Sequence, residues 1–215
     1  MIGEKIDTTF LNSSAADQIL AAFDFWKNTH RSVLAIAGES GSGKTHMATA
    51  LQHALAEKGR QALILHMDDF FKLPPASNHA KRLQDIGHVG PEEVDLYRLN
   101  NFISAFKDGS TQQMVPLVDY YQNSSSEIEM ELNEIQVVII EGTYAFFIDN
   151  TDFHLFMSRD YKQTKELRIA RNRGTEAQDE FVDRVLEIEH QLISKSASKA
   201  DALIDFHFNL KLKWK

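Results

Sequence analysis

Apolar and polar residues follow two different periods along this chain. Short apolar runs bounded by turn residues predict buried strands at 32–38, 61–67, 135–142 and 153–157. The run at 135–142 is continuous, which is typical of a strand covered on both faces. Apolar residues three or four positions apart predict helices at 13–30, 44–59, 90–109, 160–174 and 177–195.

Two segments in the middle of the chain predict a β-hairpin. Residues 115–121 and the alternating acidic and apolar residues 127–132 flank the polar stretch "QNSSS". Residues 201–210 predict a last strand. Because strands and helices otherwise alternate, we expect an α/β fold in which a mostly parallel central sheet carries helices on both faces.

The size and charge of the chain limit the kinds of protein that it can be. Its 215 residues fit one domain, and no apolar run approaches the ~18 residues of a membrane-spanning helix. The N-terminus lacks the basic and then apolar regions of a secretory signal, and cysteine is absent. The net charge of −8 argues against broad nucleic-acid binding, which needs a basic surface. We therefore expect a cytoplasmic protein with no membrane or nucleic-acid partner, while formation of a homo-oligomer stays open.

A glycine-rich loop lies between the first buried strand and the helix after it. Gly38 to Thr45 reads "GESGSGKT", which fits the pattern G-x-x-x-x-G-K-[ST]. Glycines let successive N–H groups turn toward phosphate oxygens, and the positive end of the helix adds to the attraction. Lys44 would reach the β- and γ-phosphates, and the Thr45 hydroxyl would bind Mg²⁺. The loop therefore predicts a site for a nucleoside triphosphate, with ATP and Mg²⁺ as the expected ligands.

Acidic residues follow two of the other predicted strands. Asp68 and Asp69 lie at the carboxyl end of one, where open α/β sheets form their ligand crevice. Asp68 is the candidate to accept a proton from a substrate hydroxyl or to help hold Mg²⁺, and Asp69 should point the other way. Glu141 ends the strand at 135–142 and suits a metal role. The alternative is that these acids are structural and bond backbone amides or cap a turn.

A group of arginines suggests a lid. Arg168 and Arg171 are three positions apart and share a helical face, and Arg173 precedes Gly174. We expect residues 168–179 to close over phosphate charge, although a solvated basic helix face is the alternative.

The order of these motifs resembles the uridine kinase family, whose relatives include phosphoribulokinase and bacterial pantothenate kinase. The resemblance covers most of Val33–Asp205 and rests on "GESGSGKT", "MDDFF", "GPEEVDLYRL", "VPLVDYY", "VVIIEGTYAF", "LRIARNRG" and "KADALIDF". It implies a P-loop NTPase fold with a β-hairpin flap over the substrate and an arginine-bearing lid. It also implies ATP-dependent phosphorylation of a hydroxyl group on a small molecule. We expect one such kinase domain over 1–215, with residues 1–32 as a helical N-terminal extension.

The motifs and the resemblance together assign roles to particular residues. The residues expected to act in catalysis are Asp68, Lys44, Arg168 and Arg171. Those expected to hold Mg²⁺ are Thr45, Glu141 and Asp68. Those expected to meet the acceptor are Asp68, Phe71, Tyr120 and Arg168. The nucleotide is expected to bind Gly38, Glu39, Ser40, Gly41, Ser42, Gly43, Lys44, Thr45, His46 and Arg173.

The predicted hairpin departs from the family pattern at two positions. Val118 and Asn123 stand where uridine kinases usually carry a tyrosine and a histidine. We therefore predict that uridine and cytidine are poor substrates. Two alternatives to a uridine kinase-like enzyme stay open: the same chemistry on a non-nucleoside acceptor, such as a sugar phosphate or a vitamin precursor, and a nucleotide-binding regulatory P-loop protein.

Overall fold

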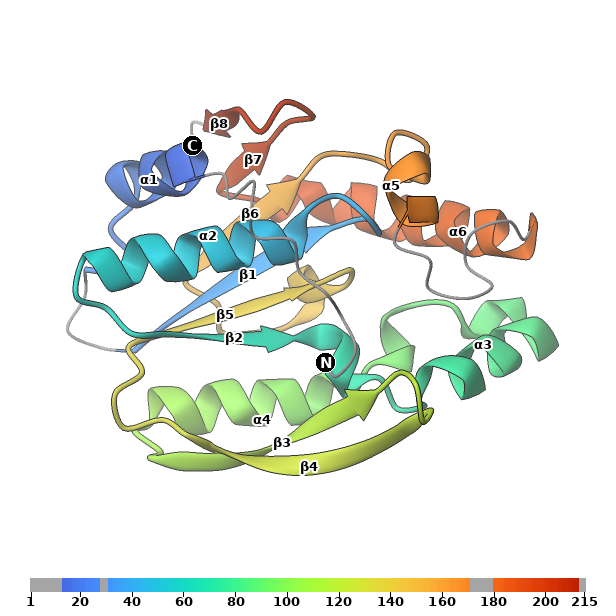
Figure 1. The fold of residues 1–215 in the computed structure, drawn as a ribbon, viewed down its shortest axis with the longest axis horizontal. Helices are drawn as coiled ribbons and strands as arrows, with labels where there is room; N and C mark the ends of the chain where they lie inside the picture. Colours follow the sequence, from blue (N-terminus) through green and yellow to red (C-terminus); the bar gives the residue numbers. More distant parts are fainter. Residues whose placement is uncertain (1–12, 28–30, 171–179, 213–215) are drawn as a thin grey trace.

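The computed structural model describes residues 13–27, 31–170 and 180–212 (Figure 1). Its helices are α1 (Ser13–Ala22), α2 (Lys44–Glu57), α3 (Pro75–Gln84), α4 (Leu96–Lys107), α5 (Lys165–Ala170) and α6 (Glu180–Ser196). Its strands are β1 (Ser32–Gly38), β2 (Ala62–His66), β3 (Gln112–Asp119), β4 (Ser124–Glu131), β5 (Val137–Gly142), β6 (Phe153–Met157), β7 (Ala202–Ile204) and β8 (Leu210–Leu212). None of the described helices is both long and apolar enough to span a membrane.

Six strands of the described chain form one sheet in the order β2-β5-β1-β6-β7-β8. Strands β2, β5, β1, β6 and β7 pair in parallel, and within this sheet β8 runs antiparallel to β7. The predicted mostly parallel sheet is confirmed, but the single strand predicted at 201–210 is wrong. The Asp205 carboxylate accepts the N–H groups of His207 and Asn209 at 2.9 and 3.0 Å, and this turn reverses the chain after β7.

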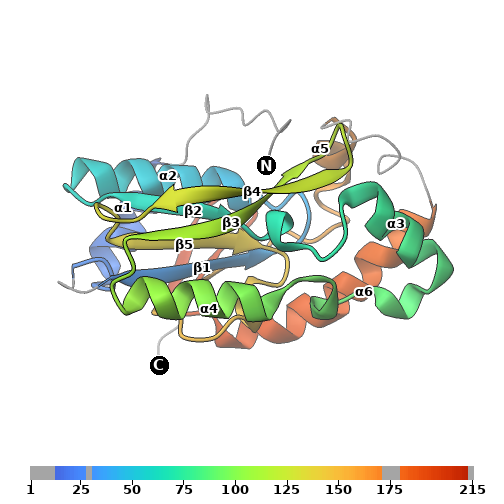
Figure 2. The same cartoon turned by 90° about the horizontal axis from the view of Figure 1, so that it is seen from below.

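The sheet is the middle one of three layers (Figures 1 and 2). Helices α1 and α2 cover one face, and α4 and α6 cover the other. Side chains of β1 alternate between these layers, since Leu34 and Ile36 pack with α1 and α2, while Val33 and Ala35 pack with α4. Because both faces of the strand are buried, its sequence is an uninterrupted apolar run, as predicted.

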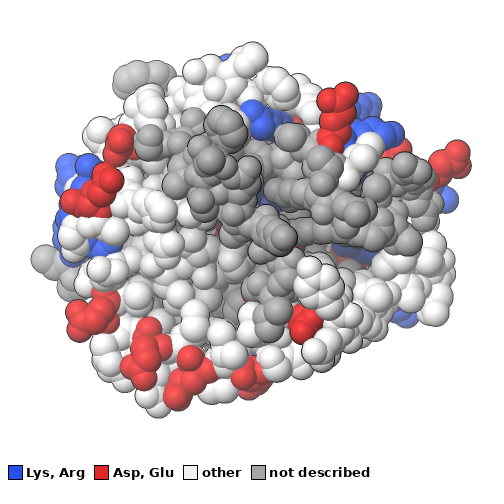
Figure 3. Space-filling view, in the orientation of Figure 1, with Lys and Arg blue, Asp and Glu red and all other residues white. Residues whose placement is uncertain are grey.

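Strands β3 and β4 form a separate antiparallel hairpin, which confirms the predicted one. Val115 of β3 and Met130 of β4 pack on the same apolar cluster as α4, so the hairpin lies beside this helix (Figure 2). Glu127, Glu129 and Glu131 of β4 are exposed, and Figure 3 shows acidic side chains along this edge of the molecule. Charged side chains on an open strand edge discourage pairing with the strands of other molecules.

Helix α1 ends at Ala22, so the helix predicted at 13–30 is wrong over residues 23–27, and residues 28–30 lie outside the described residues. Phe23 and Phe25 both place their rings against Phe153, with centroid distances of 4.4 and 4.8 Å. Side chains two positions apart on an α-helix point in different directions, so this shared contact does not fit a continued helix. The chain instead turns at residues 25–27, where the Lys27 N–H donates to the Asp24 carbonyl at 2.9 Å. The indole N–H of Trp26 donates to the Leu20 carbonyl at 2.9 Å and satisfies one of the free carbonyls at the helix end.

The helix predicted at 90–109 also begins later than expected. The N–H of Lys72 donates to the Glu93 carbonyl, and the N–H of Asp95 donates to the Phe70 carbonyl, both at 2.8 Å. Residues Pro91–Glu93 form a single 3₁₀ turn, and these bonds across the chain hold residues 94 and 95 out of a helix. The Asp95 carboxylate then caps α4 by accepting the Arg98 N–H at 3.0 Å. Helix α5 likewise starts later than the predicted residue 160, and α3 lies in a polar stretch where no element was predicted.

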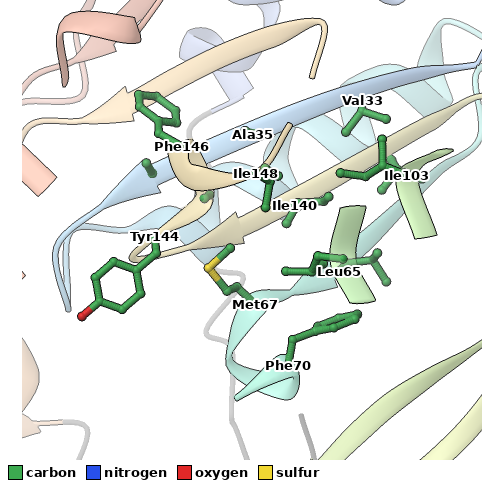
Figure 4. Close-up of a cluster of buried hydrophobic side chains, with 14 of the residues drawn as sticks. Val33, Ala35, Leu65, Met67, Phe70, Ile103, Ile140, Tyr144, Phe146 and Ile148 are labelled. Atoms are coloured by element: carbon green, nitrogen blue, oxygen red, sulfur yellow. The ribbon is translucent and has the colours of Figure 1, made fainter. Parts of the chain in front are cut away.

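A close contact between Gly142 and Met67 joins the end of β5 to the turn after β2. A Cβ atom on Gly142 would lie 2.3 Å from the Cβ of Met67, which leaves no room for any side chain. Met67 is fully buried, and Figure 4 shows it between Tyr144 and the strands of the sheet. The neighbouring residues Glu141 and Asp68 therefore lie at the same edge of the sheet.

We predict that Gly142→Ala lowers the free energy of unfolding by about 3 kcal/mol, the upper end of the usual overpacking cost. Met67 cannot rotate its own Cβ away, so relief would require one backbone to move. The measurement is the urea midpoint at an unchanged slope. Gly59→Ala is the matched control: Gly59 has a φ of 72° and a Cβ added there would meet no atom within 4 Å, so only left-handed strain of about 1 kcal/mol should appear. A larger loss at Gly59 than at Gly142 would contradict this account.

Candidate active site

The loop between β1 and α2 gathers positive charge around a tight turn. Gly41 and Gly43 have φ angles of 78° and 97°, left-handed values that glycine adopts without strain. The Lys44 ammonium donates to the Glu39 carbonyl at 3.0 Å and so lies across the loop. The Ser42 hydroxyl is buried and has no hydrogen-bond partner among the described residues. With the amino end of α2 behind it, the loop suits a phosphate group.

A threonine, a glutamate and a histidine meet beside this loop. The Thr45 hydroxyl donates to Glu141 Oε1 at 3.0 Å, and His66 Nδ1 lies 2.7 Å from the same oxygen. Thr45 comes from the first turn of α2, while Glu141 and His66 come from the carboxyl ends of the paired strands β5 and β2. Mg²⁺ prefers oxygen ligands, so the Thr45 hydroxyl and the Glu141 carboxylate beside the phosphate loop fit a Mg²⁺ site.

The surroundings of Glu141 favour its ionised form. Burial alone would raise the pKa of Glu141, but His66, Lys44 and Thr45 outweigh it and hold this pKa below its ordinary value. Burial alone would lower the pKa of His66, but the hydrogen bond and charge of Glu141 raise this pKa above its ordinary value. A negatively charged carboxylate is therefore available at the sheet edge.

The two aspartates after β2 point to different places, as predicted. Asp69 is buried, and its Oδ1 accepts the N–H of Val118 at 2.9 Å, which ties the hairpin to this turn. Asp68 is partly exposed and lies in a cavity, where the Tyr120 hydroxyl approaches its Oδ2 at 3.4 Å. Asp69 thus supports the structure, and Asp68 is the carboxylate that can reach a ligand.

The phosphate loop is also held from α6. Glu39 is buried, and its Oε1 lies 2.6 Å from His190 Nδ1. Its other carboxylate oxygen accepts the N–H of Tyr161 at 2.6 Å. The second residue of the loop therefore connects β1 to α6 and to the segment that leads into α5.

A further contact fixes Arg168 near the loop. The Thr164 hydroxyl donates to the Ser40 carbonyl at 2.8 Å, and α5 starts directly afterwards. Arg168 Nη2 donates to the Tyr161 carbonyl at 2.9 Å, and its side chain runs within 3.0 Å of where a Cβ on Gly41 would stand. The Arg168 side chain therefore packs against the phosphate loop and lines the same cavity as Ser40, where it can meet negative charge.

A cavity of about 160 Å³ lies between the phosphate loop and helices α3 and α6. Ser40 of the loop lines it, together with Asp68, Phe71, Tyr120 and Arg168. The last four are the residues predicted to meet the acceptor, and they come from the turn after β2, the end of the hairpin and α5. The structure therefore brings residues from distant parts of the sequence to one small space next to the phosphate site.

The far wall of the cavity holds a charged cluster that the sequence analysis missed. The Arg82 guanidinium of α3 donates from Nε and Nη2 to the two oxygens of the buried Glu93. Asn78 Nδ2 and the Gly90 N–H donate to the same carboxylate, each at 2.9 Å. Arg82 Nη2 also donates to Glu189 of α6 at 3.1 Å. Burial raises the pKa of Glu189; Arg82 opposes this rise and Glu93 adds to it, so the pKa lies above its ordinary value.

One part of this cluster had a signal in the sequence. Glu189 lies four positions from both Val185 and Ile193, on the apolar stripe that α6 buries. An acid within such a stripe indicates a buried partner or a ligand site. Arg82 and Glu93 carry no comparable signal, because their surroundings in the sequence are polar.

The two hairpin positions that depart from the uridine kinase pattern do not line the cavity. The Val118 side chain is 1% exposed and is not among the residues that line the cavity. Asn123 sits in the hairpin turn with a φ of 48°, where its side chain bonds the Ala76 N–H and the Ser77 hydroxyl. Their substitution therefore changes the hairpin and its contact with α3 rather than the cavity wall.

Other predicted site residues are placed only in part. His46 lies half-buried in the first turn of α2. Arg171, Arg173 and most of the predicted lid at 168–179 lie outside the described residues.

Comparison with known proteins gives the same picture. A family model described as "Phosphoribulokinase / Uridine kinase family" matches residues 33–205. The bifunctional alpha-galactosidase/sucrose kinase AgaSK of Mediterraneibacter gnavus is 28% identical over 187 residues, which cover 81% of this chain but only 20% of that protein. A uridine kinase of Leuconostoc citreum is 25% identical over 187 residues, or 80% of this chain and 86% of that one.

A solved structure supports the fold. The structure of a possible uridine kinase from Bacillus stearothermophilus aligns with a TM-score of 0.66 at 20% identity, over 88% of this chain and 97% of that one. The family model covers the phosphate loop, the acids at the sheet edge, the hairpin and both cavity helices. The chain therefore belongs to the phosphoribulokinase/uridine kinase family of P-loop small-molecule kinases.

Proposed function

We propose that this protein uses ATP and Mg²⁺ to phosphorylate a hydroxyl group of a small molecule, in the manner of a uridine kinase. The observation that carries the proposal is that the Asp68 carboxylate shares one small cavity with Ser40 of the phosphate loop and with Arg168. A hydroxyl group bound there would have a base on one side and the terminal phosphate on the other. This is the arrangement that in-line phosphoryl transfer needs.

The proposed step uses three side chains. Asp68 accepts the proton of the acceptor hydroxyl while the oxygen of that hydroxyl forms a bond to the γ-phosphorus. The bond between the γ-phosphorus and the oxygen that bridges it to the β-phosphorus breaks, and ADP leaves. Lys44 and Arg168 stabilise the negative charge spread over the transferred group.

Thr45 and Glu141 are the residues that would hold Mg²⁺. Their oxygens meet at 3.0 Å beside the loop, and Asp68 lies at the same sheet edge. Bound Mg²⁺ would neutralise charge on the phosphate oxygens. The chain itself supplies an ionised carboxylate and an oriented hydroxyl for this purpose.

The motifs do not name the acceptor, and the relatives point in more than one direction. One relative is a uridine kinase, and another contains a sucrose kinase. A nucleoside is therefore one candidate acceptor and a non-nucleoside hydroxyl compound, such as a sugar phosphate or a vitamin precursor, is the other. Val118 and Asn123 do not line the cavity, so their identities are a weaker argument against uridine as the acceptor. The prediction that uridine and cytidine are poor substrates is therefore tested by measuring their turnover directly.

Acceptor-dependent release of ADP tests the proposed function. The purified protein is incubated with ATP and Mg²⁺, alone and with nucleosides, sugars and vitamin precursors in turn. We expect ADP release to rise strongly with a matching acceptor and to stay slow without one, and we expect uridine and cytidine to be poor. ATP hydrolysis at the same rate with and without every acceptor would instead identify a regulatory nucleotide-binding protein.

A further inference from the structure

The charge on the acceptor side of the cavity is set by the cluster at Arg82. The side chains of Arg82 and Glu189 are 16% and 10% exposed, and that of Glu93 is fully buried behind them. Both carboxylate oxygens of Glu93 already accept hydrogen bonds: Arg82 donates to each of them, Asn78 also donates to Oε1, and the Gly90 N–H also donates to Oε2. Two carboxylates thus face one guanidinium, and Arg82 is not the free cation that its place in the cavity would suggest.

The residues on this side of the cavity should therefore repel an anionic group on the acceptor. Arg82 already donates hydrogen bonds to the carboxylates of Glu93 and Glu189, and such charge-assisted bonds are among the strongest hydrogen bonds in proteins. An anionic acceptor would have to compete with them. Glu189 and Asp68 both line the cavity and add carboxylates to it. Arg168 also lines the cavity, but it lies at the phosphate loop, where the proposed function assigns its charge to the transferred phosphoryl group. Like charges placed next to each other cost several kcal/mol, so a carboxylate or phosphate on the acceptor should be rejected.

An uncharged polyhydroxy compound fits the same wall well. Its hydroxyl groups can donate to the carboxylates of Glu189 and Asp68 and can accept from Tyr120 and Thr143. Phe71 offers an apolar surface for the carbon skeleton. The volume of about 160 Å³ is well below the ~300 Å³ at which pockets for drug-sized ligands begin, which favours an acceptor smaller than a nucleoside.

We propose that the acceptor is an uncharged polyhydroxy compound of about monosaccharide size, and that Glu189 with its Arg82–Glu93 support excludes anionic analogues. This inference rests on the proposed kinase function and narrows it to one chemical class. It also rejects a sugar phosphate, one of the acceptors left open by the sequence.

Matched pairs of acceptors test the proposal on the wild-type protein. Each pair joins an uncharged sugar to its anionic counterpart: D-ribose with ribose 5-phosphate, D-fructose with fructose 6-phosphate, and D-glucose with D-gluconate. Uridine serves as the larger uncharged compound. We expect at least one uncharged sugar to be phosphorylated with a kcat/KM at least about 100-fold above that of its counterpart and above that of uridine.

A variant then locates the source of the discrimination. Glu189→Gln keeps the size of the side chain and an oxygen for Arg82 but removes one negative charge. We expect the ratio of kcat/KM between the uncharged and anionic members of a pair to fall by about tenfold. Glu187→Gln, at an exposed position on the same helix, is the control and should leave the ratio unchanged.

The outcomes separate the acceptor class from the kinase function. A higher kcat/KM for an anionic compound than for its uncharged counterpart would overturn the inference and leave the kinase function intact. Turnover of uridine above every sugar would overturn the proposed size. An unchanged ratio in folded Glu189→Gln would remove the role of this residue. If no compound of either class raises ADP release above the ATP-only rate, both the inference and the kinase function fail.

Discussion

Replacement of Asp68 by asparagine is expected to lower kcat by about 10²–10⁴-fold, the usual worth of a general base. Asparagine keeps the shape of the side chain but cannot take the proton of the acceptor hydroxyl. Asp68 lies in the cavity and approaches the Tyr120 hydroxyl, whereas the phosphate loop is built from other residues. The dissociation constant of ATP should therefore change little, and rapid-quench measurement of product formation together with equilibrium binding of ATP checks both quantities.

Asp69→Asn is the matched control for this experiment. Asp69 accepts the N–H of Val118, and the asparagine oxygen can accept the same hydrogen bond. We expect kcat to stay within a few-fold of the wild-type value. A larger loss of kcat in Asp69→Asn than in Asp68→Asn would show that the two carboxylates have been given each other's roles.

Removal of the Lys44 side chain by alanine should have the second-largest effect, a loss of about 10²–10³-fold in kcat. The Lys44 ammonium lies across the loop through its bond to the Glu39 carbonyl, so it is already in place before a nucleotide binds. A preorganised charge of this kind stabilises the transferred phosphoryl group without reorganisation during the reaction. Steady-state kinetics at saturating ATP, with the best acceptor, measures the change.

Lys58→Ala controls for loss of a positive charge at the far end of the same helix. Lys58 is exposed and follows the last residue of α2, at the end opposite the phosphate loop. Its removal should leave kcat near the wild-type value. Normal turnover in Lys44→Ala would mean that the loop does not hold the reacting phosphate.

The phosphate loop and the sheet were accessible to sequence reasoning because their signals are local. The loop is one contiguous stretch, and β1 and β5 are apolar runs because alternate residues of each strand face two buried layers. The ends of helices were harder to predict. The start of α4 depends on bonds from residues 93–95 to Phe70 and Lys72, which no local pattern near α4 records.

The residues around the acceptor were also hard to predict from local sequence patterns. Phe71 and Tyr120 could be named from their positions in motifs, and both line the cavity. Val118 and Asn123 were also named from motifs, but the first is buried and the second forms the hairpin turn. A motif fixes the order of residues along the chain, whereas the direction of a side chain on a twisted hairpin depends on what the hairpin packs against.

The order of residues was enough to predict the phosphate loop, a mostly parallel α/β domain with a hairpin, and the acids at the sheet edge. These follow from short-range rules of backbone geometry and from burial periodicity. Which charges face the acceptor became known only from the folded chain. Arg82 meets Glu189 across 107 positions of the chain, and Thr45 meets Glu141 across 96. Such pairs form because separate elements pack side by side, so their chemistry is set by the packing and not by neighbours in the sequence.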